Sequence, residues 1–287
     1  MATEDGLIPD VAQAWNIKYD DLEIGKEIGK GAFGSVYKGS YFGTEVAIKR
    51  IVEEDPDCLV YLEREVNVLQ GMRHPNVVQL IGVCNHESGL LLVTEWVRNG
   101  DLRKYLKNSS VVMPWKLRVK IANDVACAMA YLHSRNIIHR DLKAKNLLVD
   151  DNWRIKICDF GFARIASSDQ RPMTLCGTDD WMAPEVILGM PYGPAADVFS
   201  YGVVLAEIVS RKKVTTELQR SALDAYGLDI PKFRKLAPPD TPPGFMALVE
   251  QCCEYEPSKR PTFKQIIKLL AQIFRALMAA DAKPATP

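Results

Sequence analysis

The stretch that decides the fold is His139-Arg140-Asp141-Leu142-Lys143-Ala144-Lys145-Asn146, which is followed thirteen residues after Asn146 by Asp159-Phe160-Gly161. Asp141 can accept the proton of a hydroxyl group, and Asn146 and Asp159 can hold Mg²⁺. Lys143 can neutralise negative charge on a phosphoryl group as it moves. Phosphoryl transfer needs these groups close together. The alternative interpretation, a loop with ordinary surface charges, does not explain two such motifs in this order.

The two motifs match the H-R-D-x-K-x-x-N and D-F-G signatures, so the chain resembles the eukaryotic protein kinases. The resemblance covers about residues 22–270. It implies an α+β, bilobal fold with a small antiparallel N-lobe sheet and one helix at residues 22–97, and a larger, mainly helical C-lobe at residues 98–275. ATP would bind in the cleft between the lobes. We expect residues 1–21 to be a lead-in segment and residues 276–287 to be a disordered tail.

Composition excludes several other classes of protein. The 287 residues carry 36 basic and 36 acidic side chains, whereas nucleic-acid binders usually have a strong basic excess. No apolar run reaches the length that a membrane span needs. The acidic N-terminus lacks a signal-peptide pattern, and the seven cysteines form no C-x-x-C motif. These features predict a soluble, cytoplasmic protein without structural zinc, and nothing in the sequence indicates an oligomeric state.

Three glycines form a further motif near the start of the predicted N-lobe. Gly29, Gly31 and Gly34 have the G-x-G-x-x-G spacing, in which backbone N–H groups can approach phosphates without a side chain between them. A dinucleotide-binding fold uses the same spacing, but it places the motif between a strand and a helix. Here apolar, strand-like segments lie on both sides, and Val36 completes G-x-G-x-x-G-x-V. The pattern therefore favours the kinase glycine-rich loop.

A lysine at the end of an apolar strand is the next candidate. Val46-Ala47-Ile48-Lys49 matches the V-A-I-K motif, so Lys49 is expected to hold the α- and β-phosphates. As an exposed lysine it should contribute little to stability. Its acidic partner should lie on the helix predicted for residues 59–72, which carries Glu63 and Glu65. The spacing of Glu65 from His74-Pro75-Asn76 favours Glu65, and leaves Glu63 on the solvated face.

The resemblance to kinases also implies a set of nucleotide contacts. Thr94 would be the gatekeeper residue beside the adenine, the backbone of Glu95 and Val97 would meet the adenine edge, and Leu148 would form the floor of the adenine site. Asp101 can bond the ribose or simply cap the helix that follows it. The residues expected to bind ATP are Ile28, Gly29, Gly31, Gly34, Val36, Ala47, Lys49, Thr94, Glu95, Val97, Asp101, Leu148 and Asp159.

The segment after Asp159 ends in Ala183-Pro184-Glu185, which matches the A-P-E signature. Within it, Thr178 would bond Asp141 and Lys143 and shape the loop that receives a substrate hydroxyl. Lys143 and the Gly177-Thr178 pair resemble serine/threonine kinases more than tyrosine kinases. Two further residues would be anchors: Asp197 for the backbone of the catalytic loop, and Arg260 as the partner of Glu185.

Phosphorylation within this segment is a predicted means of regulation. Thr174 lies four residues before Thr178, and a phosphate there could form charge-assisted bonds to Arg140. Arg164 and Arg171 are possible extra partners. Thr174 can also be an ordinary loop threonine, and Ser167 and Ser168 are competing sites.

C-lobe motifs resemble the tyrosine-kinase-like group, and most of all its LIM-kinase and testis-specific-kinase branch, as Asp197-Val198-Phe199-Ser200 and Cys252-Cys253 illustrate. That branch implies dual specificity and actin-depolymerising proteins as substrates. The sequence departs from it at Lys143-Ala144-Lys145-Asn146 and lacks a strongly basic insert in the activation segment. We expect an active serine/threonine kinase that phosphorylates a protein substrate with ATP and uses Mg²⁺, or alternatively Mn²⁺, as its metal ion. A dual-specificity kinase and a silent pseudokinase scaffold remain the alternatives.

Overall fold

The structure is a computed structural model that describes residues 15–31, 34–51, 56–87, 89–165, 180–218, 220–222 and 225–281. It divides into two compact units. Unit 1 comprises Met1–Arg98 and Asp159–Ala163, and unit 2 comprises Asn99–Cys158 and Arg164–Pro287. The short segment Asp159–Ala163 thus belongs to unit 1, although the chain on either side of it belongs to unit 2.

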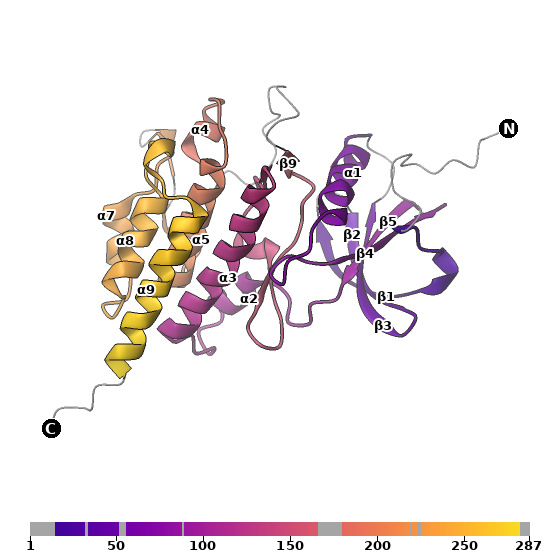
Figure 1. Ribbon diagram of the computed structural model, residues 1–287, viewed down its shortest axis with the longest axis horizontal. Helices are drawn as coiled ribbons and strands as arrows, with labels where there is room; N and C mark the ends of the chain where they lie inside the picture. The colour runs from indigo at the N-terminus through magenta and orange to yellow at the C-terminus, as the bar shows by residue number, and fades with distance from the viewer. Residues whose placement is uncertain are drawn as a thin grey trace. The chain divides into compact units, whose positions relative to one another are not determined.

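Unit 1 contains a five-stranded antiparallel sheet in the order β1-β2-β3-β5-β4 (Figure 1). The strands are β1 (Leu22–Gly31), β2 (Gly34–Tyr41), β3 (Thr44–Ile51), β4 (Leu80–His86) and β5 (Gly89–Glu95). The helix α1 (Pro56–Gln70) connects β3 to β4. A turn precedes β4, in which the Val77 N–H donates to the His74 carbonyl.

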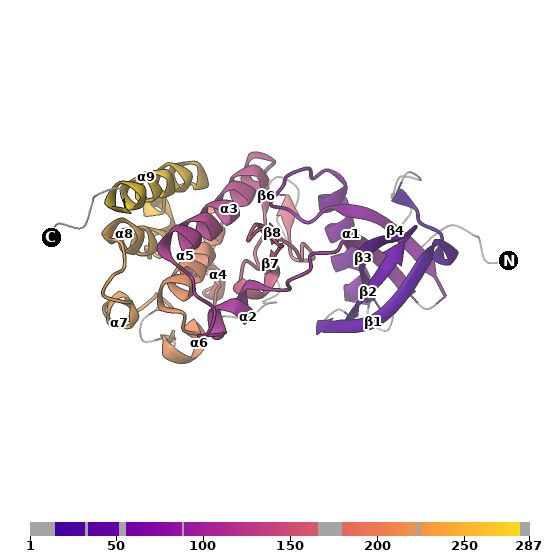
Figure 2. The ribbon, with the colours of Figure 1, turned by 90° about the horizontal axis from the view of Figure 1, so that it is seen from below.

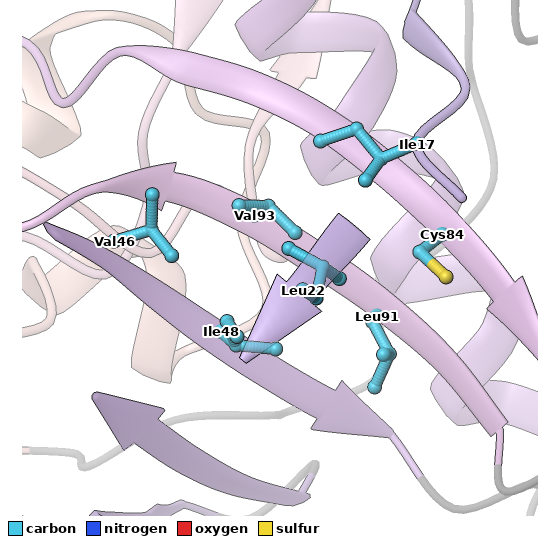
Figure 3. Packing of buried hydrophobic residues seen from close by; sticks show 7 residues of the cluster. All are labelled: Ile17, Leu22, Val46, Ile48, Cys84, Leu91 and Val93. Atoms are coloured by element: carbon cyan, nitrogen blue, oxygen red, sulfur yellow. The ribbon is translucent and has the colours of Figure 1, made fainter. Parts of the chain in front are cut away.

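Alternation along β3 separates two faces of the sheet. Val46 and Ile48 point to one face, where they pack with Leu22, Cys84, Leu91 and Val93. Ile17, from the segment expected to be a lead-in, joins this cluster and is 5% exposed (Figure 3). Its backbone N–H donates to Val83 of β4, and the 3₁₀ turn η2 (Tyr19–Asp21) then leads into β1. Residues 16–21 thus help to cover this face of the sheet. The sequence could not predict this, because a single apolar residue outside any periodic pattern does not indicate burial.

We predict that Ile17→Ala destabilises the protein by about 2–5 kcal/mol, because it removes a fully enclosed side chain from a core that can collapse only partly. Urea denaturation should show a lower midpoint with an unchanged slope. Asn16→Ala, at an exposed neighbouring position, is the matched control. A change below about 0.5 kcal/mol in Ile17→Ala would show that the segment is not part of the stable unit.

Unit 2 is mainly helical, and the long helix α5 (Ala195–Ser210) is buried along almost its whole length. α8 (Pro243–Cys252) packs on α5, and α9 (Phe263–Asp281) lies beside α3 (Trp115–Ser134) in both ribbon views (Figures 1 and 2). Its shorter helices are α2 (Leu102–Lys107), α4 (Pro184–Ile187), α6 (Val214–Glu217) and α7 (Ile230–Leu236), with 3₁₀ turns η3 (Ala144–Asn146) and η5 (Pro257–Lys259). Two small antiparallel sheets pair β6 (Ile137–Ile138) with β9 (Arg164–Ile165), and β7 (Leu147–Val149) with β8 (Ile155–Ile157).

The last helix corrects one boundary expected from the sequence. α9 continues to Asp281, whereas residues from 276 onward were expected to be disordered. Its helical apolar spacing persists past Ile273 to the partly buried Leu277, and the Asp281 carboxylate pairs with Lys116 of α3 at 2.5 Å. Among the described residues, no helix combines the length and apolar character required to span a membrane.

Candidate active site

The first group of candidate residues lies in unit 1, around Lys49 on β3. Lys49 Nζ donates to Glu65 Oε2 of α1 at 2.6 Å. Leu62, Val66 and Leu69 fix the rotation of α1 because they are buried on its inner side, and Glu65 lies on that side with an exposure of 4%. Glu63, the other glutamate of this helix, is half-buried. Lys49 pairs with Glu65, as the spacing in the sequence predicted.

Asp159 joins this pair from the other segment of unit 1. Its Oδ1 lies 3.3 Å from Lys49 Nζ, and the next residue, Phe160, donates its backbone N–H to Glu65 Oε1 at 3.2 Å. Burial lowers the pKa of Lys49, but the charges of Glu65 and Asp159 more than reverse this, so its pKa is raised. Lys49 therefore remains an ammonium ion at neutral pH, as a phosphate-binding lysine must.

Several expected nucleotide contacts share the sheet face of Lys49. Gly29 is opposite Val36, Val36 is opposite Lys49, and Ala47 is opposite Thr94, so the side chains of these positions point to the same face. This is the face opposite to Val46 and Ile48, and α1 covers part of it through Glu65. The sheet pleat thus gathers residues that the sequence assigned to one nucleotide.

The glycine-rich motif is described only in part, since residues 32–33 lie outside the described chain. Gly34 has φ of +136°, and a Cβ there would lie 2.0 Å from the Arg50 carbonyl oxygen, so only glycine fits. At Gly29, a Cβ would meet no atom of the described structure within 4 Å. Gly31 ends β1, and Ile28 on the same strand is 39% exposed.

The segment at the end of β5 holds the residues expected at the adenine edge. The Glu95 carboxylate accepts a hydrogen bond from the backbone N–H of Gln79 at 2.9 Å, and this bond holds the Glu95 side chain against the chain that precedes β4. The Val97 side chain is 5% exposed. These contacts order the backbone whose N–H and C=O groups the sequence analysis assigned to adenine.

The second group of candidate residues lies in unit 2, on the loop between β6 and β7. Lys143 Nζ lies 2.8 Å from the Asp141 carboxylate. Asn146 Nδ2 donates to both Asp141 Oδ2 and the Asp141 carbonyl at 2.9 Å. Asp141 and Asn146 are 9% and 3% exposed, so these bonds hold the carboxylate in one orientation. A carboxylate held in this way can accept a proton from a hydroxyl group that reaches it.

Asp197 holds the start of this loop, as the sequence predicted. Its two carboxylate oxygens accept the backbone N–H groups of His139 and Arg140 at 2.9 and 2.8 Å, and His133 of α3 lies 2.8 Å from the same carboxylate. Burial raises the pKa of Asp197, but the bonds to His133 and to the backbone outweigh this and lower it. Because the pKa of Asp197 is lowered, its ionised carboxylate stabilises the folded protein at any pH above the ordinary pKa of aspartate. This stabilisation is lost as the pH falls through the lower pKa that Asp197 has in the folded state.

Two other residues that the sequence singled out have clear positions in unit 2. Arg260 makes a two-pronged ion pair with Glu185 at 2.6 and 2.9 Å, and both residues are buried, which confirms their predicted pairing. Asp101 accepts the backbone N–H of Lys104 at 3.3 Å and so caps α2, one of the two roles considered for it. Leu148 forms a β-bridge with Asp101, which fixes both positions in unit 2.

Some candidate residues lie outside the described residues, namely Thr178, Thr174, Ser167, Ser168 and Arg171. Sequence reasoning missed His133 as a partner of Asp197, since a histidine in the last turn of a helix carries no signal by itself. It also missed Tyr192, whose hydroxyl accepts from Arg140 Nη1 at 3.2 Å. Arg140, which precedes Asp141, has φ of +68° and is thus held in an uncommon backbone conformation.

The model of the protein tyrosine and serine/threonine kinase family matches residues 22–270, which include both groups of candidate residues.

Curated relatives from Dictyostelium discoideum are similar over almost the whole chain. A probable serine/threonine-protein kinase is 47% identical over 98% of this chain and 42% of its own length. The probable serine/threonine-protein kinase kinX is 47% identical over 95% of this chain and 25% of its own length. The RasGEF domain-containing serine/threonine-protein kinase X is 45% identical over 99% of this chain and 30% of its own length. The chain therefore spans less than half the length of these relatives.

Proposed function

The chain belongs to the protein tyrosine and serine/threonine kinase family, and from this premise we propose that it transfers the γ-phosphoryl group of ATP to serine or threonine hydroxyls of a protein. The observation that carries the proposal is the Asp141 carboxylate, which Lys143 and Asn146 hold in a buried, hydrogen-bonded position. A pseudokinase scaffold does not transfer phosphate, so it would need neither the held Asp141 carboxylate nor the ion pair of Lys49 with Glu65.

In the proposed reaction, the substrate hydroxyl oxygen forms a bond to the γ-phosphorus while the bond from that phosphorus to the β–γ bridging oxygen breaks. Asp141 takes the hydroxyl proton, and Lys143 offsets charge on the transferred group. Lys49 binds the phosphates that remain on the nucleotide, and Glu65 orients Lys49.

The residues present also fit a divalent metal ion. The Asp159 carboxylate and the Asn146 side-chain oxygen are hard oxygen donors, and Asn146 uses its amide nitrogen, not this oxygen, in its bonds to Asp141. When bound, Mg²⁺ or Mn²⁺ would supply positive charge beside the phosphates. Two protein donors suit Mg²⁺, because this ion is usually bound by one or two protein groups together with phosphates and water.

Serine/threonine specificity is supported by Lys143 and by the names of the relatives. Dual specificity is the alternative. Phosphoamino-acid analysis of a labelled product decides between them, since phosphotyrosine in a mixed acceptor would support dual specificity.

We predict that Asp141→Asn removes almost all phosphoryl transfer, by a factor of about 10²–10⁴, because the amide cannot take the proton. The measurement is incorporation of labelled phosphate from ATP into a generic protein acceptor. Asp151→Asn, at an exposed position nearby in the sequence, is the matched control. If the wild-type chain transferred no phosphate while still binding ATP, the scaffold alternative would be correct.

We further propose membership of the tyrosine-kinase-like group, in the LIM-kinase and testis-specific-kinase branch, with an actin-depolymerising protein as a substrate. The C-lobe motifs support the branch, whereas Lys143-Ala144-Lys145-Asn146 departs from it. Phosphorylation of a purified actin-depolymerising protein with a higher kcat/KM than a generic acceptor would support this substrate, and the reverse order would refute it. Cytoplasmic location is proposed from the odd number of cysteines and their lack of a recognisable motif, and fractionation of cells tests it.

Regulation through the activation segment is proposed with Thr174 as the phosphorylated residue. Its support is Arg140, the residue before Asp141, whose guanidinium can donate two hydrogen bonds to the oxygens of a phosphate group. We predict that Thr174→Ala lowers activity several-fold, while Ser167→Ala/Ser168→Ala does not. Mass spectrometry of the autophosphorylated protein identifies the site. Full activity in Thr174→Ala with loss in the serine variant would move the switch to Ser167 and Ser168.

A further inference from the structure

The segment Asp159–Ala163 is attached to α1, although the chain on either side of it belongs to the other unit. Glu65 of α1 accepts the backbone N–H of Phe160. Gly161 lies directly against the same helix, since a Cβ built on it would be 3.6 Å from both the Cβ and the carbonyl oxygen of Tyr61. Two successive residues after Asp159 therefore contact α1.

A third contact follows at Phe162. The rings of Tyr61 and Phe162 have centroids 5.1 Å apart and planes tilted by 51°, which is a favourable aromatic arrangement. The Arg64 guanidinium lies 5.8 Å from the Tyr61 ring centroid on its face. Tyr61 and Glu65 are four residues apart in α1, so they lie on the same side of the helix. One side of α1 thus holds three consecutive residues.

Asp159 itself has an uncommon backbone conformation, with φ of +68°. For a residue other than glycine, such a conformation persists only where the surroundings determine it. On the C-terminal side of Asp159, these surroundings include Tyr61 and Glu65 of α1. The Asp159 carboxylate itself lies 3.3 Å from Lys49 Nζ.

We propose that Tyr61 is a positioning residue for the reaction: its ring holds Phe162 against α1 and so orients the Asp159 carboxylate for binding the metal ion. The inference rests on the proposed function. Tyr61 acts through the backbone of the segment. Its role is separate from that of Glu65, whose removal would also disrupt Lys49.

Position within α1 makes Tyr61 suitable for a test of this role. Leu62, Val66 and Leu69 are the fully enclosed residues of the helix, whereas Tyr61 is half-buried. A change at Tyr61 should therefore remove the ring contact without opening the core, unlike a change at Leu62.

The experiment compares Tyr61→Ala, Tyr61→Phe, Phe162→Ala and the double variant Tyr61→Ala/Phe162→Ala, with Val60→Ala as the matched control. Val60 neighbours Tyr61 in α1 and is 43% exposed. We expect Tyr61→Ala to raise the Mg²⁺ concentration for half-maximal activity about threefold to tenfold, in line with the loss of one aromatic pair. Tyr61→Phe, which keeps the ring, should restore wild-type behaviour, and KM for the protein substrate should stay unchanged.

The double variant gives the sharpest result. If the two rings act through their mutual contact, Tyr61→Ala/Phe162→Ala should require no more Mg²⁺ than the worse single variant. Independent, multiplying effects would overturn the proposal. So would a wild-type Mg²⁺ requirement in Tyr61→Ala, or the same change in Val60→Ala.

Amide hydrogen exchange supplies a readout that does not depend on catalysis. Exchange at residues 160–163 should become faster in Tyr61→Ala and remain at the wild-type rate in Tyr61→Phe and Val60→Ala. An inactive wild-type chain with this exchange pattern would refute the proposed kinase function while supporting the hold of Tyr61 on the segment. Unchanged exchange in Tyr61→Ala would refute that hold, whatever the activity.

Discussion

Lys49→Met is expected to lower kcat by at least about a hundredfold, because it removes a preorganised charge from the phosphates of the proposed reaction. The measurement is steady-state transfer of labelled phosphate at saturating ATP. Lys38→Met is the matched control, since Lys38 is a strand lysine in a surface ion pair with Glu45. Its activity should stay close to that of the wild type.

The structure changes what this substitution should do to stability. From the sequence, Lys49 looked like an exposed lysine whose loss would hardly affect the fold. In the structure, the Lys49 side chain is 20% exposed and the Glu65 side chain is 5% exposed, so Lys49→Met leaves a buried carboxylate without its cation. We therefore expect the free energy of unfolding to fall by about 1–3 kcal/mol.

A second substitution separates the two effects. Lys49→Met/Glu65→Gln removes the stranded charge, so it should recover much of the lost stability while activity stays low. The raised pKa of Lys49 adds a pH prediction: its ammonium form persists to a pH above the ordinary lysine pKa of about 10.4, so wild-type activity should show no loss from deprotonation of Lys49 up to that pH. Near-normal kcat in folded Lys49→Met would refute the role of this lysine.

Motif spacing explains why the sequence predicted so much of the candidate site. Lys49 and Asp159 are 110 residues apart, so their contact could not be predicted from local patterns. Each nevertheless belongs to a motif that indicates its own chemical role. Glu65 was preferred over Glu63 from spacing alone, and the helix rotation set by Leu62 and Val66 gives the physical reason. The roles of these residues in catalysis stay predictions until the variants are measured.

What the sequence did not predict depends on contacts without a repeating pattern. Ile17 enters the core from a segment with no periodicity, and Tyr61 meets Phe162 only because of the path of the backbone after Asp159. The end of α9 was placed too early because its last two turns expose most of their side chains, so the amphipathic signal fades before the helix does. Patterns in sequence report burial and chemistry, whereas these features depend on tertiary packing.

Asp159→Asn is expected to raise the Mg²⁺ concentration for half-maximal activity by more than about tenfold and to lower kcat at fixed Mg²⁺. The substitution isolates the charge. Asparagine tolerates positive φ well, so the backbone at φ of +68° should persist, and the amide has nearly the same shape as the carboxylate. Lys49 should keep its pairing with Glu65.

The controls make the metal prediction specific. Asp151→Asn removes an exposed carboxylate and should leave the Mg²⁺ requirement unchanged. Amide exchange at residues 160–163 should match the wild type in Asp159→Asn, because the contacts of Glu65 and Tyr61 with that segment do not involve the Asp159 carboxylate. Titration with Mn²⁺ beside Mg²⁺ shows which ion the site prefers. Undiminished phosphate transfer by the wild type in excess chelator, or an unchanged Mg²⁺ requirement in Asp159→Asn, would rule out Asp159 as a metal ligand, since either result means that catalysis does not use its charge.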